Sequence, residues 1–360
     1  MKKIKDNWGY IVSLILLIIF IIWMIFDYTK KKNILQEYSK NFFYMDTYIN
    51  VRIYSNNSKK ANEALNEIDK IYSDYHKLVD RYNKYDNIKN IYYINNNDSD
   101  SEYLEIDSRL YDLIEYGLNA YKETNGLINI NMGELIDIWK TYREKESGVP
   151  STEELMSANI DINRIKISSN KILNNHPNID LGALAKGYVS EIVSEYLESV
   201  GFDKYLINAG GNVIVGNHYG DGEYKIGIED PTDSNGIYEI IKGNNICITT
   251  SGDYQRYYDY NGVRYHHIID PNTLYPSNYV KSVTVITKDG ALGDMLSTAL
   301  FLMSVDEGKE FIKKYDNVEA VWYTTDNETI KSEGFDKYEQ KWCSINCCII
   351  SFFINFNCIY

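Results

Sequence analysis

Residues 249–276 have the sequence TTSGDYQRYYDYNGVRYHHIIDPNTLYP, which concentrates polar, aromatic and titratable side chains in one short stretch. It holds a Ser-Gly-Asp corner, two arginines, two adjacent histidines and an Asp-Pro turn. Runs that predict strands, residues 246–250 and 282–287, flank it. Such a mixture is typical of a functional site and not of a hydrophobic core.

The second half of this stretch, GVRYHHIID, predicts a strand that follows an Asn261-Gly262 hairpin turn and ends at an Asp-Pro turn. Successive side chains of a strand point to opposite faces, so His266 and His267 are not expected to enter the same pocket. One face would carry Arg264, His266, Ile268 and Asp270, and the other Tyr265, His267 and Ile269.

Several further segments complete a pattern that extends well beyond this stretch. They are Met45-Asp46-Thr47, residues 126–139, DLGALAKGY at residues 180–188, DMLSTA at residues 294–299, and, within the stretch, Thr250-Ser251-Gly252, Arg256-Tyr257 and HIIDPNT at residues 267–273. In this order the segments resemble the ApbE family of flavin transferases over roughly residues 40–337. DLGALAKGY and DMLSTA are the most specific of the matches.

The resemblance implies an α+β fold, a single domain of mixed, mainly antiparallel strands with flanking helices over residues 40–338. It implies a Mg²⁺-dependent FAD:protein FMN transferase, which moves FMN from FAD to a Thr or Ser hydroxyl of an acceptor protein and releases AMP. The usual acceptors of the family are flavoprotein subunits of membrane redox complexes.

Two other functions stay open. Water could replace the acceptor hydroxyl, which would make the protein an FAD pyrophosphatase, or the chain could be a membrane-tethered flavin-binding protein without activity. The presence of both the metal motif and His267 favours an enzyme.

The resemblance also assigns residues. His267 is the expected catalytic base, a role that suits the titration range of histidine. The metal ligands would be the Ala183 carbonyl oxygen, Asp294 and Thr298. The residues expected to contact FAD are Met45, Tyr82, Ile130, Asn131, Met132, Asp180, Lys186, Ser251, Gly252 and Ile268.

Local sequence alone leaves structural alternatives for several of these residues. Without the resemblance, Met45 is more typical of core packing than of a ligand contact. The Asp and the small residues of DLGALAKGY suit a capped, tightly packed helix as well as an anion site. On a helix Asp294 and Thr298 lie one turn apart and could share a hard cation, but an Asp is often a cap and a Thr often bonds to its own helix backbone.

Periodicity predicts the other elements. Helices are expected over residues 61–78, 110–124 and 182–200, and strands over residues 42–54, 225–228 and 237–241. Residues 205–215 predict a strand interrupted at Gly210-Gly211 by a bulge. The segment LININMGELIDIW departs from the commoner family form, which has Asp, Thr and Pro where this chain has Asn129, Asn131 and Glu134.

Composition and the two ends limit the partners. The 360-residue chain has a net charge of −14 and no basic stripe, which excludes nucleic acid as an expected partner. Residues 8–26 carry no charge and are nearly all apolar, so residues 1–29 are expected to anchor the chain in the cell membrane. Residues 30–39 would form a helical stalk, and the resemblance implies that the catalytic domain lies outside the cytoplasm.

Residues 339–360 form an atypical hydrophobic tail. It holds Cys343, Cys347, Cys348 and Cys358, whereas Cys247 is the only cysteine elsewhere in the chain. Our hypothesis is that residues 342–360 are an out-of-frame or read-through extension, which resequencing the locus would test.

Overall fold

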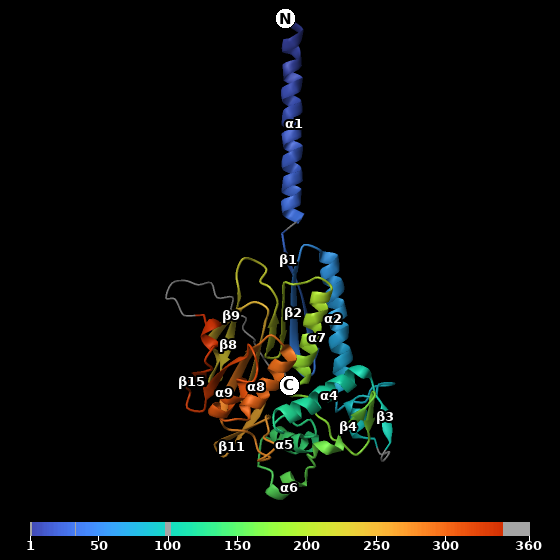
Figure 1. Ribbon diagram of the computed structural model, residues 1–360, viewed down its shortest axis with the longest axis vertical. Helices are drawn as coiled ribbons and strands as arrows, with labels where there is room; N and C mark the ends of the chain where they lie inside the picture. Colours follow the sequence, from blue (N-terminus) through green and yellow to red (C-terminus); the bar gives the residue numbers. More distant parts are fainter. Residues whose placement is uncertain (1, 33, 98–101, 341–360) are drawn as a thin grey trace.

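The computed structural model describes residues 2–32, 34–97 and 102–340. An eight-stranded antiparallel sheet forms the middle of the molecule (Figure 1). Its strands, in spatial order, are β1 (Gln36–Tyr44), β2 (Thr47–Ser55), β6 (Tyr205–Ala209), β7 (Asn212–Val215), β10 (Ile246–Gly252), β13 (Val280–Thr287), β14 (Glu319–Thr324) and β15 (Thr329–Lys331).

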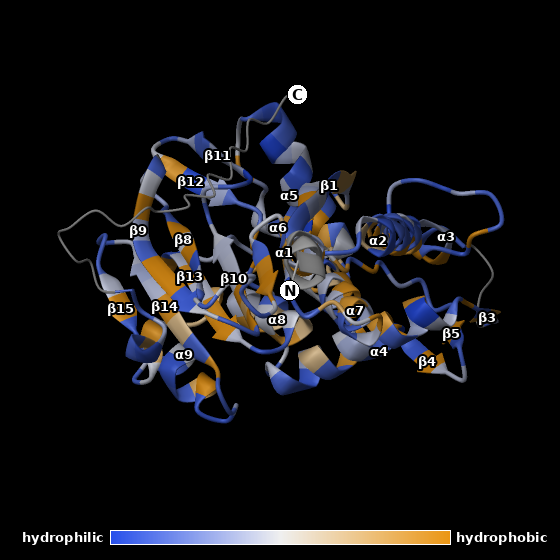
Figure 2. Ribbon diagram, turned by 90° about the horizontal axis from the view of Figure 1, so that it is seen from above, coloured by the Kyte–Doolittle hydropathy of each residue, from blue (hydrophilic) through white to orange (hydrophobic). Residues whose placement is uncertain are grey.

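Three helices cover one face of this sheet: α2 (Ser58–Val79), α7 (Ala185–Ser199) and α8 (Gly290–Phe301). Helix α2 shows why this packing is stable. Its Asn57 cap accepts a hydrogen bond from the Lys60 N–H group, and its buried residues recur at helical spacing, as with Ala61, Leu65 and Ile68. The opposite side of α2 is hydrophilic (Figure 2).

The other face of the sheet is covered by a long hairpin of β8 (Tyr224–Asp230) and β9 (Asp233–Gly243). Strand β7 is therefore buried on both sides. Its Val213 and Val215 pack with the hairpin, whereas Ile214 packs with the helices. This two-sided burial explains why the strand consists of apolar residues without a polar alternation.

Further helices and strands complete the described fold. The helices are α3 (Ile91–Asn95), α4 (Ser108–Glu123), α5 (Gly133–Lys145), α6 (Thr152–Ser157) and α9 (Val305–Ile312), with 3₁₀ turns at Ile162–Arg164 and Phe335–Lys337. The strands are β3 (Tyr103–Glu105), β4 (Lys166–Ser168) and β5 (Lys171–Leu173), which form a small sheet, and β11 (Tyr257–Tyr260) and β12 (Val263–His266), which form a hairpin.

Two predictions about turns were wrong. The strand expected over residues 42–54 is a hairpin, because Met45 and Asp46 both take left-handed φ angles, 52° and 55°, and reverse the chain between β1 and β2. The bulge expected at Gly210-Gly211 is also a hairpin turn, with φ of 59° and 98°. A Cβ atom on Gly210 would lie 2.0 Å from Thr47 Oγ1, so glycine is needed there for close approach as well as for its backbone angle.

The N-terminal expectations also change. Helix α1 (Lys2–Lys32) lies apart from the rest of the molecule in Figure 1. Among the residues that the structure describes, no helix combines the length and the apolarity needed to cross a bilayer, so the span expected over residues 8–26 is not supported. The expected helical stalk is also wrong from Gln36 onward, where β1 begins. The tail from residue 341 lies outside the described residues.

Candidate active site

A cavity of about 1080 Å³ lies where the ends of β10 and α8 approach the β1–β2 turn. Pockets for drug-sized ligands are ~300–1,000 Å³, so this one has room for a dinucleotide. The predicted site residues that line it are Met45, Tyr82, Met132, Asp180, Ala183, Lys186, Ser251, Gly252, His267, Ile268, Asp294 and Thr298. These residues come from segments spread over most of the chain, and only the fold brings them together.

His267 lines this cavity just beyond the end of β12. Burial, together with the nearby cations Arg256, Arg143 and Lys186 and the ring of His266, holds the pKa of His267 well below its usual range. Its Nδ1 atom is buried and has no hydrogen-bond partner among the described residues. The imidazole is therefore neutral at neutral pH and has a ring nitrogen that can accept a proton.

His266 points elsewhere, as alternation along the strand predicts. Its Nε2 atom contacts the Ser277 carbonyl oxygen, and its Nδ1 atom accepts a hydrogen bond of 3.2 Å from the Ile268 N–H group. His266 lies in the interior, where it is only 4% exposed, and burial lowers its pKa to about 4. The alternation ends with β12, since His267, Ile268 and Ile269 all line the cavity.

Asp294 on α8 is held by the start of α7. Its Oδ2 atom accepts a hydrogen bond of 2.8 Å from the Gly187 N–H group and lies 3.9 Å from Lys186 Nζ. A Cβ atom on Gly187 would lie 2.4 Å from Asp294 Cβ, so this helix contact requires glycine. Burial raises the pKa of Asp294, and Lys186, the Gly187 N–H group and Asn212 oppose that rise.

The residues around Asp294 suit a hard cation. Thr298 lines the cavity one turn further along α8, and its Oγ1 atom lies 3.4 Å from Ser251 Oγ. Asp294 is not the cap of α8, because Asp289 has that role. Within the described part of the chain, no three His, Cys, Asp or Glu side chains converge on a possible metal position. One carboxylate, a hydroxyl and the Ala183 carbonyl match the oxygen ligands of Mg²⁺, which usually completes its shell with water and substrate phosphates.

Met45 and Tyr82 line the cavity; Met45 is half-buried and packs against the hydrophobic core, whereas Tyr82 is exposed. Met45 is in the β1–β2 turn, where its N–H group donates a hydrogen bond of 3.3 Å to His76 Nδ1. Tyr82 follows α2 and is 47% exposed. A thioether and an aromatic ring of this kind are suitable contacts for a flat ligand.

Comparison with known proteins identifies the family. The profile of the ApbE family matches residues 45–322. The FAD:protein FMN transferase of Vibrio cholerae is 30% identical over 250 residues, which are 67% of this chain and 74% of that protein, and a Klebsiella pneumoniae protein of the same name is 31% identical over 62% and 71%. A crystal structure of an ApbE protein from Thermotoga maritima has a TM-score of 0.76 at 26% identity and covers 85% of this chain and 100% of its own. This chain belongs to the ApbE family. The flavin transferase ApbE from Vibrio cholerae has a TM-score of 0.71, also at 26% identity, over 84% of this chain and 99% of its own.

Two residues assigned from the ApbE pattern do not line the cavity. Ile130 is 1% exposed and Asn131 is fully buried. The Ile130 carbonyl oxygen accepts a hydrogen bond of 2.9 Å from the Asp180 N–H group, and Asn131 Oδ1 accepts one of 2.8 Å from the Asn178 N–H group. Both residues therefore brace the segment that carries Asp180 and do not form the cavity surface.

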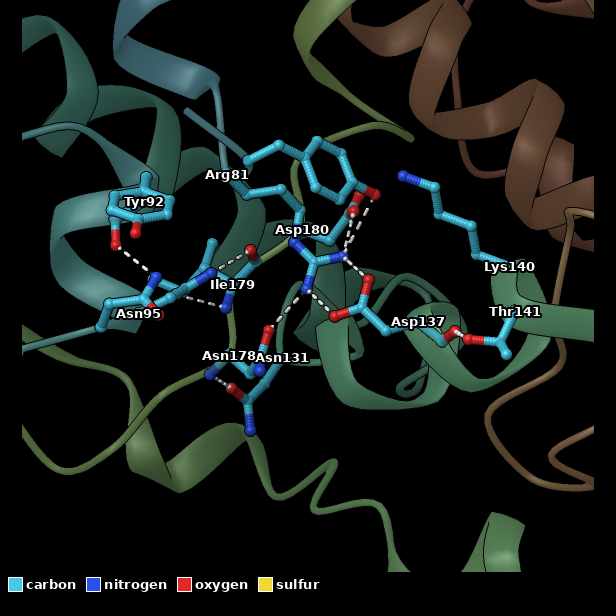
Figure 3. Close-up of polar contacts among 12 residues, drawn as sticks. Arg81, Tyr92, Asn95, Asn131, Asp137, Lys140, Thr141, Asn178, Ile179 and Asp180 are labelled. Atoms are coloured by element: carbon cyan, nitrogen blue, oxygen red, sulfur yellow. Dashed lines mark hydrogen bonds and ion pairs between the residues drawn. The ribbon is translucent and has the colours of Figure 1, made fainter. Parts of the chain in front are cut away.

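Arg81 is a site residue that sequence analysis missed. Its side chain is 7% exposed and donates hydrogen bonds to Asp137 at 2.9 and 2.8 Å, to Asn178 Oδ1 at 2.7 Å and to Asp180 Oδ2 at 3.4 Å (Figure 3). Burial opposes its charge, but the carboxylates of Asp180 and Asp137 outweigh that effect and raise the pKa of Arg81. No local sequence motif predicts this cluster, because its residues are far apart in the chain.

Arg143, Arg256 and Asn212 were also missed, and all three line the cavity. Neither arginine forms an ion pair with the described residues. Burial lowers the pKa of Arg143, and the nearby positive charge of Arg256 lowers it further. Asn212 is 2% exposed, and its Nδ2 atom has no hydrogen bond of ordinary geometry within the described structure. These groups suit a ligand that carries negative charge and hydrogen-bond acceptors.

Proposed function

We propose that this chain is a FAD:protein FMN transferase that requires Mg²⁺ and transfers FMN to a Thr or Ser hydroxyl of an acceptor protein. The observation that carries the proposal is the cavity itself. It combines a neutral histidine, a wall of hard oxygen ligands and a thioether–aromatic pair in a volume that fits FAD. The names of the relatives supply the reaction that this combination serves.

Binding follows from the chemistry of the lining. Met45 and Tyr82 would contact the flavin ring, and Asp180 its polar substituents. Lys186, Arg143 and Arg256 would offset the charge of the two phosphates, since two of these cations lack a carboxylate partner in the described structure.

Asp294, Thr298 and the Ala183 carbonyl would hold Mg²⁺. When bound, the ion would neutralise charge on the pyrophosphate as that bond breaks. Gly187 fixes Asp294 for this role, because its N–H group holds one carboxylate oxygen and leaves the other for the cation.

His267 would take the proton of the acceptor hydroxyl. The hydroxyl oxygen forms a bond to the phosphorus of the FMN moiety, the bond from that phosphorus to the bridging oxygen breaks, and AMP leaves with the bridging oxygen. An anionic ligand offsets the cations that lower the pKa of His267, so FAD binding makes this imidazole a stronger base.

The test is incubation of the full-length protein with FAD and Mg²⁺, with and without a flavoprotein subunit as acceptor. AMP is measured by chromatography, and covalent flavin by fluorescence in a denaturing gel. Acceptor-dependent AMP release with flavin on the acceptor is the expected result. AMP release that needs no acceptor would assign FAD hydrolysis instead, and bound FAD without AMP would assign a binding protein. Loss of turnover in EDTA and its return with Mg²⁺ tests the metal.

We also propose that the catalytic domain lies outside the cytoplasm. Its support is compositional: Cys247 is the single cysteine of the described residues, and it is buried. Protease added to intact cells should digest the domain, and protection in cells with digestion in lysates would contradict the proposal.

A further inference from the structure

Arg81 and Tyr82 are adjacent in sequence, and helix α5 contacts both of them. Asp137 forms the bidentate ion pair with the Arg81 guanidinium, and Lys140 lies on the Tyr82 ring, with its Nζ atom 3.9 Å from the ring centroid. Asp137 and Lys140 are three residues apart, which places them on one face of the helix. Figure 3 shows both side chains directed from α5 toward the segment that carries Arg81.

Each of these contacts leads to a residue that lines the cavity. Through Arg81, Asp137 is connected to Asp180, which lines the cavity. Lys140 touches Tyr82, which also lines it, whereas Lys140 itself does not. The ammonium group therefore contacts the Tyr82 ring from outside the cavity. The Arg81 guanidinium contacts the same ring, with its Cζ atom 5.1 Å from the ring centroid, and donates a hydrogen bond of 3.4 Å to the Tyr82 hydroxyl oxygen, so Lys140 and Arg81 hold the ring together. The ring is still 47% exposed, which leaves surface for a ligand.

We propose that Asp137 and Lys140 are positioning residues of the flavin site: Asp137 fixes Asp180 through Arg81, and Lys140 fixes the ring of Tyr82. The inference rests on the proposed function for the identity of the ligand. Tyr82 is half exposed, and an unsupported ring at that position would sample several rotamers that binding must then restrict. A ring already held in place binds a flat ligand with less loss of entropy.

The first experiment is a double-mutant cycle on the full-length protein, with FAD as the probe. Binding is titrated by the quenching of flavin fluorescence. Lys140→Met keeps the aliphatic chain and removes the charge, and we expect a Kd about two- to fivefold higher, the size of one cation–π contact. Lys140→Arg should restore wild-type affinity. In a Tyr82→Ala background, Lys140→Met should have no further effect.

A matched control lies on the same helix. Lys145 has its Nζ atom 5.8 Å from the Tyr142 ring centroid, and neither residue lines the cavity. Lys145→Met should leave the Kd for FAD unchanged. If Lys140→Met has no effect in the wild-type background, or an equal effect in the Tyr82→Ala background, Lys140 does not act through the ring and the proposal fails.

The second experiment tests whether Asp137 fixes Asp180 through Arg81. Arg81→Lys keeps the charge but loses the fork that binds two oxygens of Asp137, and we expect the Kd for FAD to rise about tenfold while kcat at saturating FAD stays within about threefold. Asp137→Asn should raise the Kd in the wild type and add little in the Arg81→Lys background. A fall in melting temperature with an unchanged Kd for FAD would show that Arg81 and Asp137 have only a structural role, and would overturn this part of the proposal.

These outcomes are separable from the proposed function. If the wild type binds FAD but releases no AMP, the transfer reaction is wrong, and the binding cycles still decide the positioning role. If the wild type does not bind FAD, both proposals fail.

Discussion

The cavity has two walls that are built in different ways. The first, the motif wall, has Lys186, Asp294 and Thr298 at the cavity, with Gly187 behind Asp294. The second, the network wall, has Arg81 and Asp180 at the cavity, with Asp137 and Asn178 behind them. In the motif wall, partners within each helix are one turn apart or adjacent. In the network wall, Arg81 is separated from Asp137 by 56 positions and from Asp180 by 99.

The difference shows what each wall contributes. Under the proposed function, the carboxylate, the hydroxyl and the ammonium group of the motif wall would meet the charge that changes during phosphoryl transfer, so their loss should affect turnover. The network wall holds ligand contacts in place from behind, so its loss should affect binding. Substitutions in the two walls should therefore separate kcat from the Kd for FAD.

The largest expected effect is that of Asp294→Asn in the motif wall. The amide keeps the shape of the side chain but removes the charge that would hold Mg²⁺, and turnover should fall on the order of 10³-fold or more. The Kd for FAD should rise only a few-fold, because the ring contacts stay. AMP release and fluorescence titration measure the two effects.

Asp289→Asn is the matched control for this substitution. Asp289 caps α8 by accepting a hydrogen bond from the Leu292 N–H group, and Asn is an equally good cap. Its turnover should stay close to that of the wild type. Full activity of Asp294→Asn in millimolar Mg²⁺ would remove Asp294 from the metal site.

The next effect concerns the histidines. His267→Ala should lose ~10²–10⁴-fold in transfer while FAD still binds. His266→Ala should retain turnover in the folded fraction but lower the melting temperature, since His266 is buried and hydrogen-bonded on both ring nitrogens. A turnover defect that is larger in His266→Ala than in His267→Ala would reverse the two roles.

The pH dependence provides a second check on His267. Because its pKa is lowered, the base stays neutral as the pH falls through 6.5, and the acid limb of kcat/KM for FAD should lie well below that value. A limb centred at 6.5 or higher would contradict a buried base surrounded by cations in the free enzyme.

The contrast between the walls also explains how far the sequence could be interpreted. Helices α2 and α4 were predicted within a few residues, because their buried residues recur at helical spacing. Lys186, Asp294 and Thr298 were assigned because they match two motifs of the ApbE family, although the contact between Gly187 and Asp294 that joins those motifs spans 107 positions. Arg81 was missed because a single arginine after a helix carries no local signal of its partners.

The errors have equally specific causes. Met45 takes a left-handed backbone angle that is uncommon for its residue type, so the alternating pattern hid the turn between β1 and β2, although Asp46 is of a type that enters this region more often. Gly210-Gly211 is compatible with a bulge and with a hairpin, and only the pairing of β6 with β7 decides between them. Asn131 resembles a ligand contact in the motif, but its amide bonds to the backbone of residues 159, 161 and 178.

A smaller effect is expected from Asn212, which lies on β7 near Asp294. Its buried Nδ2 atom has no partner of ordinary geometry in the described structure, and leaving such a donor unpaired costs ~1–3 kcal/mol. Asn212→Leu removes this donor but also the amide that helps lower the pKa of Asp294, so the melting temperature should change little while the Kd for FAD rises about tenfold. Thermal melts and titrations on the same sample measure both.

Asn208 is the control for Asn212. Its Oδ1 atom is also buried without a partner among the described residues, but it lies on the neighbouring strand and does not line the cavity. Asn208→Leu should leave the Kd for FAD unchanged. Equal loss of affinity in both variants would show that the effect comes from the strands and not from a contact with the ligand.

The smallest effect concerns the pH dependence of the motif wall. Glu191 on α7 accepts a hydrogen bond of 2.7 Å from the Gly290 N–H group at the start of α8, and burial raises its pKa from 4.5 to about 7. The folded state therefore holds this proton more tightly than the unfolded state. The resulting stability is fully present below pH 4.5 and is lost as the pH rises through 7.

Glu191→Gln removes this titration and keeps an oxygen for the Gly290 N–H group. A shift of this size is worth at most ~3 kcal/mol, and because Glu191 is partly solvated we expect the variant to be more stable than the wild type by ~1–2 kcal/mol at pH 8. At pH 4.5 the two should unfold alike. Glu195→Gln, one turn further along α7 and exposed, should match the wild type at both pH values. Ionisation of Glu191 at alkaline pH should therefore loosen the contact between α7 and α8. The Arg81 ion pairs of the network wall should stay intact at pH 8, because the pKa of Arg81 is raised. A stability difference for Glu191→Gln that is equal at pH 4.5 and pH 8 would show that packing, not the buried charge, is responsible.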